Sequence, residues 1–207
     1  MKKGMLIALE GPDGSGKSTQ IKMLSEYLKD KGYNVLLTRE PGGTEISEKI
    51  REIILDNNNH NMCGMCEALL YAASRAQLSE QVLKPALEEG TIVLCDRFVY
   101  SSIVYQGIAR DLGIDKIEYI NKAALNGVEA DLIIMIDIDY EEGLKRKCNQ
   151  KQLDRLENCG SDFHKKVYDG YQAIKNKFNN MIIIDGSREL NQVHEDIVKE
   201  IKKIIKQ

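Results

Sequence analysis

The feature that most constrains this chain is the run Gly-Pro-Asp-Gly-Ser-Gly-Lys-Ser at residues 11–18. It fits the pattern G-x-x-x-x-G-K-[ST], in which glycines let backbone N–H groups turn toward phosphate oxygens. In such a loop Lys17 reaches the β- and γ-phosphates, and the Ser18 hydroxyl binds magnesium. The run therefore predicts a nucleoside triphosphate site. Its expected residues are Gly11, Asp13, Gly14, Ser15, Gly16, Lys17, Ser18 and Thr19.

The segments on either side of this run have the periodicity that such a loop needs. Residues 5–9 are a short apolar run, as expected for a parallel strand buried on both faces. After the loop, Ile21, Leu24 and Leu28 recur at helical spacing, and Gly32 follows as a stop signal. A strand, a glycine-rich turn and a helix N-terminus together favour binding of an anion.

The rest of the chain alternates strands and helices, without internal repeats or a linker that would divide it. The alternation predicts one α/β domain over 1–207, a doubly wound five-stranded parallel sheet with helices on both faces. Expected strands cover 5–9, 34–38, 91–95, 131–137 and 181–185. After the loop helix, expected helices lie near 45–56, 67–83, 99–109, 115–126, 139–148, 161–177 and the C-terminus. The polar segment at about 147–160 has weak periodicity and is expected to be a short mobile lid.

Composition resembles that of ordinary soluble proteins. The 207 residues are 43 % hydrophobic and 29 % charged, with a formal net charge of −3. This balance gives no sign of a nucleic acid or membrane-surface partner. No apolar run approaches the roughly 18 residues of a membrane span, and the first four residues lead straight into the first strand. We therefore expect no membrane partner, no signal peptide and a cytoplasmic location.

The five cysteines raise the question of a metal or a disulfide. Without secretory context, an odd number is typical of reduced thiols. Cys63 and Cys66 have C-x-x-C spacing, which can hold zinc or perform redox chemistry. A zinc site needs a second pair, and Cys148 and Cys159 are too widely spaced to resemble one. We interpret the C-x-x-C stretch as an ordinary loop leading into a helix, with metal and redox roles as the alternatives.

Charged side chains follow three of the expected strands. Ligands of open α/β sheets bind beyond the carboxyl ends of the strands. Lys17 follows the first strand, Arg39 the second, and Asp96 with Arg97 the third. A single triphosphate does not need a lysine and two arginines, so the excess charge predicts a second anionic ligand facing the first. The leading interpretation is a magnesium-assisted transfer between two phosphates, with Ser18 and Asp96 as metal ligands.

Longer motifs give the chain a resemblance to a known family. Residues 96–106 read Asp-Arg-Phe-Val-Tyr-Ser-Ser-Ile-Val-Tyr-Gln and look like the signature stretch of thymidylate kinases. The stretches 38–44, 67–77 and 154–157 resemble that family's second motif, third motif and lid. The resemblance runs in order from residue 5 to about residue 185. It implies a P-loop NTPase-like fold, ATP-dependent conversion of dTMP to dTDP with Mg²⁺, and a homodimer.

The resemblance also implies which residues bind dTMP. Tyr71 and Arg75 lie four apart on one helix face, so the ring can stack on a pyrimidine while the guanidinium binds an exocyclic oxygen. Ser102 fits the position that contacts the N3/O4 edge of the base, and Tyr105 fits the one that crowds the 2′ position of the sugar. Asp13 resembles the carboxylate that holds the 3′-hydroxyl. The full expected dTMP site is Asp13, Arg39, Tyr71, Arg75, Arg97, Ser101, Ser102, Tyr105 and Gln106.

No general base is required, because the acceptor phosphate is already an ionised nucleophile. Arg39 and Arg97 would hold that phosphate, and Asp96 would orient magnesium through water. The resemblance implies a catalytic cation from the lid, where Arg155 is the first choice and Lys151 the second. The expected catalytic set is Lys17, Asp96, Arg97, Lys151 and Arg155.

The motifs depart from the family's pattern at a few positions. Ser74 stands where relatives often carry an acidic residue, and Leu156 where some carry an aromatic one. Two alternatives stay open: a kinase of other pyrimidine nucleotides such as deoxyuridylate, and a nucleotide-dependent switch or catalytically silent relative. A guanine-specific switch would need Asn-Lys-x-Asp, whereas residues 121–124 read Asn-Lys-Ala-Ala.

Overall fold

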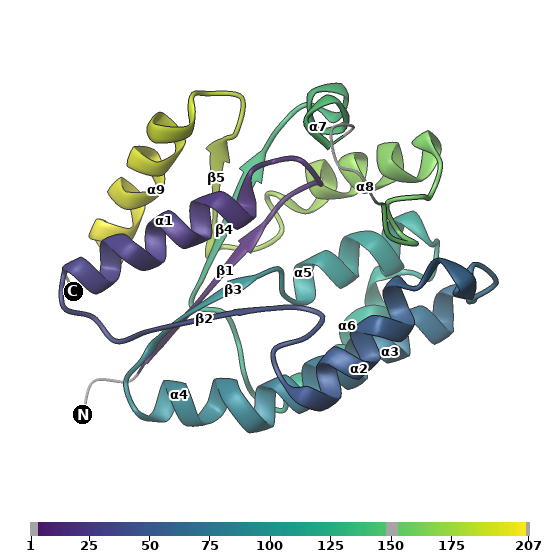
Figure 1. Ribbon diagram of the computed structural model, residues 1–207, viewed down its shortest axis with the longest axis horizontal. Helices are drawn as coiled ribbons and strands as arrows, with labels where there is room; N and C mark the ends of the chain where they lie inside the picture. Colours follow the sequence, from purple (N-terminus) through teal and green to yellow (C-terminus); the bar gives the residue numbers. More distant parts are fainter. Residues whose placement is uncertain (1–3, 148–152, 206–207) are drawn as a thin grey trace.

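The strands of the computed structural model form a parallel sheet at the centre of the molecule (Figure 1). Residues 4–147 and 153–205 are described, and they contain β1 (Met5–Glu10), β2 (Val35–Arg39), β3 (Ile92–Asp96), β4 (Leu132–Asp137) and β5 (Met181–Asp185). These strands pair in the order β2-β3-β1-β4-β5, and every pairing is parallel. The predicted five-stranded parallel sheet is confirmed, and its strand ends lie within one residue of the expected positions.

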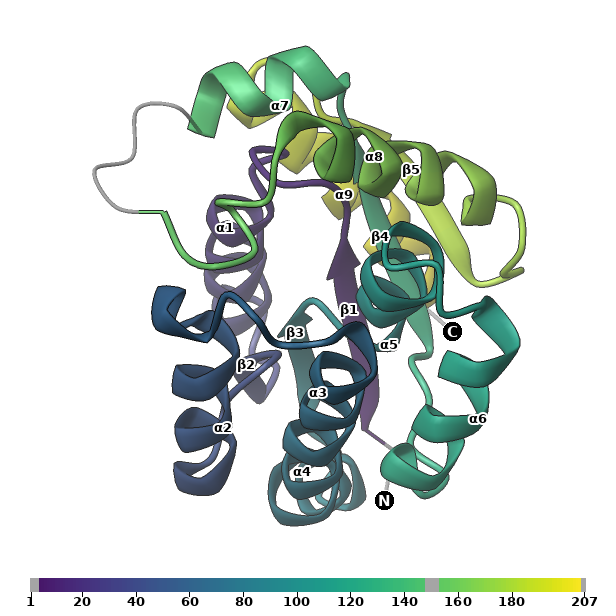
Figure 2. The same cartoon turned by 90° about the vertical axis from the view of Figure 1, so that its right-hand side faces the viewer.

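Helices cover both faces of the sheet (Figures 1 and 2). One face carries α1 (Lys17–Asp30) and α9 (Leu190–Ile205). The other carries α3 (Gly64–Leu78), α4 (Lys84–Glu88), α5 (Val99–Ser102), α6 (Ile114–Leu125) and α8 (Ser161–Ile174). Two further helices, α2 (Glu45–Leu55) and α7 (Tyr140–Lys147), pack on α3 and α8. None of the helices within 4–147 and 153–205 is long and apolar enough to cross a membrane.

Alternation along the strands explains why the sheet separates two hydrophobic cores. On β1, Leu6 and Ala8 pack into the core beneath α3–α6 and α8, while Ile7 and Leu9 pack into the core beneath α1 and α9. Successive side chains of a strand point to opposite faces, so a strand buried on both sides must be apolar throughout. The continuous apolar runs in the sequence have this cause.

Two helical stretches change geometry where the sequence predicts regular helices. The expected helix over 67–83 begins earlier, at Gly64, and Ser79–Leu83 form a π-helical turn before α4. Pro85 supplies a reason, because its ring lacks an N–H and clashes with the carbonyl four residues back. A second π-helical stretch, Ile103–Ala109, follows α5 without a break. Such turns are common at functional sites, and this one carries Tyr105 and Gln106.

The carboxyl ends of β1, β2 and β3 meet at one edge of the sheet. The register places Asp96 beside Leu9 on one side and beside Arg39 on the other. The phosphate loop leaves the same edge, and α7 packs closely over it. A Cβ atom on Gly14 would lie 2.1 Å from the Gly143 carbonyl oxygen, which is why this position requires glycine.

Candidate active site

A cavity of about 520 Å³ lies at this edge of the sheet. It is bordered by the phosphate loop, the ends of β2 and β3, α2, α3, α5 with the π-helical turn after it, α7, and Asp154, Leu156 and Glu157. The predicted site residues that line it are Asp13, Gly14, Gly16, Lys17, Ser18, Thr19, Arg39, Tyr71, Asp96, Arg97, Ser101, Ser102, Tyr105 and Gln106. Gly11, Ser15, Arg75 and Arg155 are not part of its wall. Lys151 lies outside the described residues.

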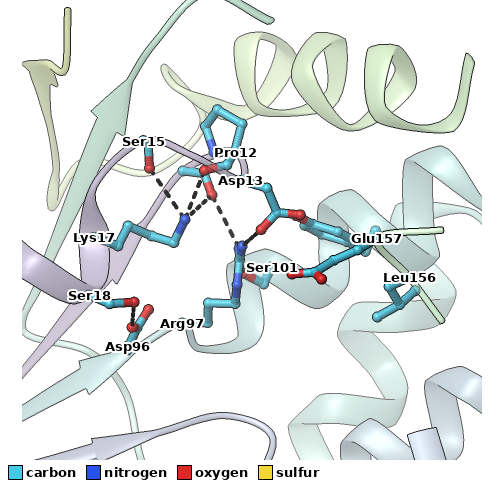
Figure 3. A network of polar contacts seen from close by, with 12 residues as sticks. Pro12, Asp13, Ser15, Lys17, Ser18, Asp96, Arg97, Ser101, Leu156 and Glu157 are labelled. Atoms are coloured by element: carbon cyan, nitrogen blue, oxygen red, sulfur yellow. Dashed lines mark hydrogen bonds and ion pairs between the residues drawn. The ribbon is translucent and has the colours of Figure 1, made fainter. Parts of the chain in front are cut away.

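Lys17 folds back over its own loop. Its Nζ donates to the carbonyl oxygens of Gly11 and Pro12, at 2.9 and 2.8 Å, and to the Ser15 hydroxyl at 3.3 Å (Figure 3). Burial, together with the nearby positive charge of Arg97, lowers the pKa of Lys17 to about 7. Gly11 and Ser15 therefore act on the site through Lys17 rather than from the cavity wall.

Ser18 and Asp96 lie side by side at the mouth of the phosphate loop. The Ser18 hydroxyl donates to Oδ2 of Asp96 at 2.7 Å (Figure 3). A hydroxyl and a carboxylate are hard oxygen donors of the kind that Mg²⁺ prefers. The two side chains thus fit a magnesium ion held next to the phosphates of a bound nucleotide.

Arg97 occupies the centre of the site. It follows β3 in a left-handed conformation, with φ 69°, and its Nη1 donates to the Gly11 carbonyl, the Ser101 hydroxyl and the Tyr171 hydroxyl, each at 3.1 Å. Its Nη2 donates to Oδ1 of Asp13 at 2.5 Å. Burial alone would lower the pKa of Arg97, but the surrounding phenol and carboxyl groups hold it well above its ordinary value. Arg97 is therefore a fixed positive charge beside the phosphate loop.

Glu10 fixes the turn that carries Arg97, and the sequence analysis missed it. Its carboxylate is fully buried and accepts hydrogen bonds from the backbone N–H groups of Phe98 and Ser101, at 2.8 and 3.1 Å. The hydroxyls of Ser101 and Tyr171 donate to its other oxygen at 2.6 and 2.9 Å. Burial raises the pKa of Glu10. A charged residue ending an apolar strand was the available signal.

Arg75, which the sequence predicts at the base, is held by a buried ion pair with Glu40. Arg75 is 1 % exposed; its Nε donates to Glu40 at 2.8 Å and its Nη2 to the Ser102 hydroxyl at 3.1 Å, while Nη1 binds Asn121. Tyr71, one turn earlier, lines the cavity. Glu40 and Asn121 determine the orientation of Arg75, whereas Ser74, at the position that is often acidic in relatives, accepts from the Gly42 N–H.

Two arginines from neighbouring elements border the cavity near the end of β2. Arg39 pairs with Glu48 at 2.7 Å and is 46 % exposed. Arg51 of α2, which the sequence analysis missed, donates to the Pro41 carbonyl at 2.9 Å, and burial lowers its pKa. The available signal was helical spacing, since Arg51 lies one turn after Glu48 in the helix that follows the 38–44 motif.

Arg155 does not face the phosphate loop in this arrangement. Its side chain is 6 % exposed; Nη2 binds Glu67 of α3 at 2.7 Å, and Nε donates to the Ile54 carbonyl at the end of α2, also at 2.7 Å. A cation that does reach the cavity from the lid side is Arg146 of α7, which donates to Glu142 and to the Gly186 carbonyl. The contacts of Arg155 instead hold the segment that follows residue 152 against α2 and α3. Its predicted catalytic role stays a prediction.

Cys63 and Cys66 are exposed at the start of α3, and both are free thiols. Among the residues that the structure describes, no group of three His, Cys, Asp or Glu side chains could hold a metal ion. Cys148 lies outside those residues.

The model of the family described as thymidylate kinase matches residues 9–197 of this chain. The chain belongs to the thymidylate kinase family. It is 52 % identical over 204 residues to a thymidylate kinase of Thermoanaerobacter sp. (strain X514), covering 98 % of this chain and all of that relative. It is 49 % identical over 199 residues to a thymidylate kinase of Finegoldia magna, covering 96 % and 98 % of the two chains. Similarity to thymidylate kinases therefore extends over the whole of the site described above.

Proposed function

We propose that this protein transfers the γ-phosphoryl group of ATP to dTMP, giving ADP and dTDP. The observation that carries the proposal is that one cavity brings these groups together. The phosphate loop with Lys17, the arginines Arg39 and Arg97, and the side chains of Tyr71 and Ser102 all line it. Membership of the thymidylate kinase family supports it. An oxygen of the acceptor phosphate forms the new P–O bond, and the β,γ-bridging oxygen leaves with the electron pair on ADP.

The donor half of the site is the phosphate loop. The backbone N–H groups of this loop and the ammonium group of Lys17 would hold the β- and γ-phosphates. Ser18 and Asp96 would hold Mg²⁺, which supplies charge neutralisation on the phosphate oxygens when bound. Arg146, which lines the cavity from α7, would close the triphosphate side.

The acceptor half of the site lies on the other side of Arg97 from the phosphate loop. Arg39 and Arg97 would bind the dTMP phosphate, and Arg51 adds a third positive charge to the same wall. Asp13 would hold the 3′-hydroxyl, and Tyr105 would occupy the space of a 2′-hydroxyl. Because the nucleophile is already ionised, these residues contribute by positioning and by neutralising charge.

We further propose that the protein works as a homodimer. Large apolar side chains are exposed on α2, α3 and α6, which pack side by side. They are Ile46 and Ile53 on α2, Leu69 on α3 and Tyr119 on α6, with Tyr119 81 % exposed. Large apolar side chains exposed on neighbouring helices are typical of an interface between subunits. The four cysteines that the structure describes are free thiols, which supports a cytoplasmic location, and the net charge of −3 gives no sign of a nucleic acid partner.

A coupled ADP-release assay with ATP, Mg²⁺ and a panel of nucleoside monophosphates tests the proposal. We expect fast turnover with dTMP, weaker turnover with dUMP, and little with UMP, CMP, dGMP and AMP. Equal turnover with several pyrimidine nucleotides would favour the broader kinase. Tight ATP binding without turnover of any acceptor would favour the catalytically silent relative.

A further inference from the structure

Gln106 borders the cavity, and only one end of its side-chain amide makes a hydrogen bond. Its Nε2 donates to Oε1 of Glu67 at 2.9 Å. Its Oε1 is buried and has no hydrogen-bond partner among residues 4–147 and 153–205. Gln106 is 1 % exposed and lines the same cavity as Tyr71 and Ser102. A buried acceptor without a partner is costly, so its retention here points to a ligand.

Glu67 determines which way this amide points. Its carboxylate is fully buried and also accepts from Arg110, with Nη2 to Oε2 at 3.1 Å, and from Arg155, with Nη2 to Oε2 at 2.7 Å. Burial alone would raise the pKa of Glu67, but the hydrogen bonds from Gln106, Arg110 and Arg155 hold it below its ordinary value. An ionised carboxylate can only accept. Turning the Gln106 amide over would place its oxygen against a carboxylate oxygen, so the amide is fixed.

The polar edge of thymine contains one donor, the ring N3–H, between two carbonyl oxygens. Cytosine presents a bare N3 acceptor at the same place. The Ser102 hydroxyl lines the cavity and accepts from Arg75, so its own O–H can donate to a carbonyl oxygen. The Gln106 oxygen is an acceptor that suits N3–H and repels a bare ring nitrogen.

We propose that Glu67 is a positioning residue for base selection: it fixes the Gln106 amide so that its oxygen faces the ring N–H of thymine or uracil and excludes cytosine. The inference rests on the proposed dTMP site. Glu67 lies one turn before Tyr71 on α3, is fully buried and does not line the cavity. It acts through Gln106 alone.

The substitution Glu67→Gln tests this role, because glutamine can donate as well as accept and so releases the Gln106 amide. The ratio of kcat/KM for dTMP to that for dCMP should fall about tenfold or more. KM for dTMP should rise more than kcat falls, since the amide meets the base and not the phosphate. The ratio of kcat/KM for dTMP to kcat/KM for dUMP should stay constant, because both bases carry N3–H. Wild-type turnover of dTMP tests the function itself, separately from these ratios.

Two further variants separate amide orientation from a structural role. Arg155→Met removes a contact to the other oxygen of Glu67; whatever its effect on stability and kcat, it should leave the dTMP/dCMP ratio of kcat/KM unchanged, because the contact of Gln106 with Oε1 remains. The double variant Glu67→Gln/Gln106→Glu should restore most of the dTMP/dCMP ratio. In it the amide at position 67 would donate to one oxygen of the carboxylate at position 106, and the other oxygen of that carboxylate would face the base. An unchanged dTMP/dCMP ratio in folded Glu67→Gln would overturn the proposal, as would failure of the double variant to restore it.

The wild-type protein gives a test that does not depend on the folding of variants. In ¹⁵N-labelled enzyme the side-chain NH₂ signals of Gln106, assigned by their loss in Gln106→Leu, report on the contact with Glu67. They should move little when dTMP saturates the enzyme, since Nε2 stays on Glu67 and only the oxygen gains a partner. A large shift of both N–H signals would show that the amide turns over on binding, and would overturn the proposal.

Discussion

Asp13 and Arg97 form an ion pair across the centre of the cavity, with Nη2 2.5 Å from Oδ1. The Tyr105 hydroxyl donates to the other carboxylate oxygen at 3.1 Å. One carboxylate of the phosphate loop therefore links the arginine expected at the acceptor phosphate to the tyrosine expected at the sugar. An acidic residue in a phosphate loop repels its anion, and this double contact explains why it is present.

The first prediction follows from this contact. Asp13→Asn keeps the shape but removes the charge that holds Arg97, and hydrogen bonds to charged groups contribute about 1.5–3 kcal/mol. We expect kcat/KM for dTMP to fall roughly 10- to 100-fold while KM for ATP changes little. Steady-state kinetics with each substrate varied in turn measures both constants. A value within threefold of wild type would remove Asp13 from the acceptor site.

The second prediction concerns the buried hydroxyl of Tyr171. It donates to Glu10 and accepts from Arg97, so Tyr171→Phe leaves both partners short of a hydrogen bond. The expected cost is about 1–3 kcal/mol, which lowers Tm by roughly 2–12 °C in a chain of this size. Tyr33→Phe is the matched control, because Tyr33 is 40 % exposed between α1 and β2 and lies outside the proposed dimer surface. Thermal unfolding of the two variants should differ clearly; equal Tm values would contradict the role given to Tyr171.

Local pattern was sufficient to predict most of the fold. The apolar runs, the glycine-rich loop and the helical spacing are properties of neighbouring residues, and the parallel topology follows from their alternation. Because parallel strands end at one edge, the meeting of Lys17, Arg39, Asp96 and Arg97 could also be predicted. The π-helical turns could not, because both depend on how a helix packs as well as on its sequence.

The sequence pattern did not predict which residues bind the buried charged side chains. Glu10 binds a turn 88 residues away, and Glu67 binds Arg155 at the same separation of 88 residues. Nothing in the spacing of the sequence links such residues. Arg155, a basic residue in a polar segment, was therefore expected at the phosphates, whereas its guanidinium binds Glu67 of α3. Arg51 was missed for a related reason, since a charged helix face is usually solvated.

The third prediction separates the two arginines of the lid region. Arg155→Met leaves Glu67 with one cation fewer, and breaking a buried ion pair costs about 3–5 kcal/mol, or roughly 6–20 °C in Tm. Arg146→Met removes a half-exposed cation from the cavity wall, so it should raise KM for ATP and lower kcat without a comparable loss of stability. Kinetics and thermal unfolding of both variants test the assignment. A stable Arg155→Met enzyme with strongly reduced kcat would restore the catalytic role to Arg155.

The fourth prediction addresses the proposed dimer. Ile53 is 47 % exposed on α2, and a glutamate there would place a charge within the apolar surface. Ile53→Glu should convert the dimer to a monomer in sedimentation velocity. Ile183→Glu is the control, because Ile183 is similarly exposed, at 41 %, on the edge strand β5. Dissociation by both substitutions, or by neither, would place the interface elsewhere.

The last prediction uses the pKa of Lys17, which is about 7 in the ligand-free protein against 10.5 ordinarily. Between pH 7 and 10.5 the unfolded chain carries a proton on Lys17 that the folded chain lacks. The contribution of Lys17 to the free energy of unfolding therefore rises with pH across this window. A bound triphosphate reverses the preference, since its negative charge favours the ammonium form.

Binding of ATP should accordingly take up a proton at alkaline pH. At pH 8 about nine-tenths of Lys17 is neutral in the free protein, so binding should take up roughly 0.9 proton, whereas at pH 6 the uptake should be about 0.1. Titration calorimetry with Mg²⁺ and ATP in buffers of different ionisation enthalpy gives these numbers directly, and the pH 6 experiment is the internal control. Equal uptake at the two pH values would mean that Lys17 is already charged before the nucleotide arrives. Its contacts with Gly11, Pro12 and Ser15 would then be those of an ammonium ion held ready for the phosphates.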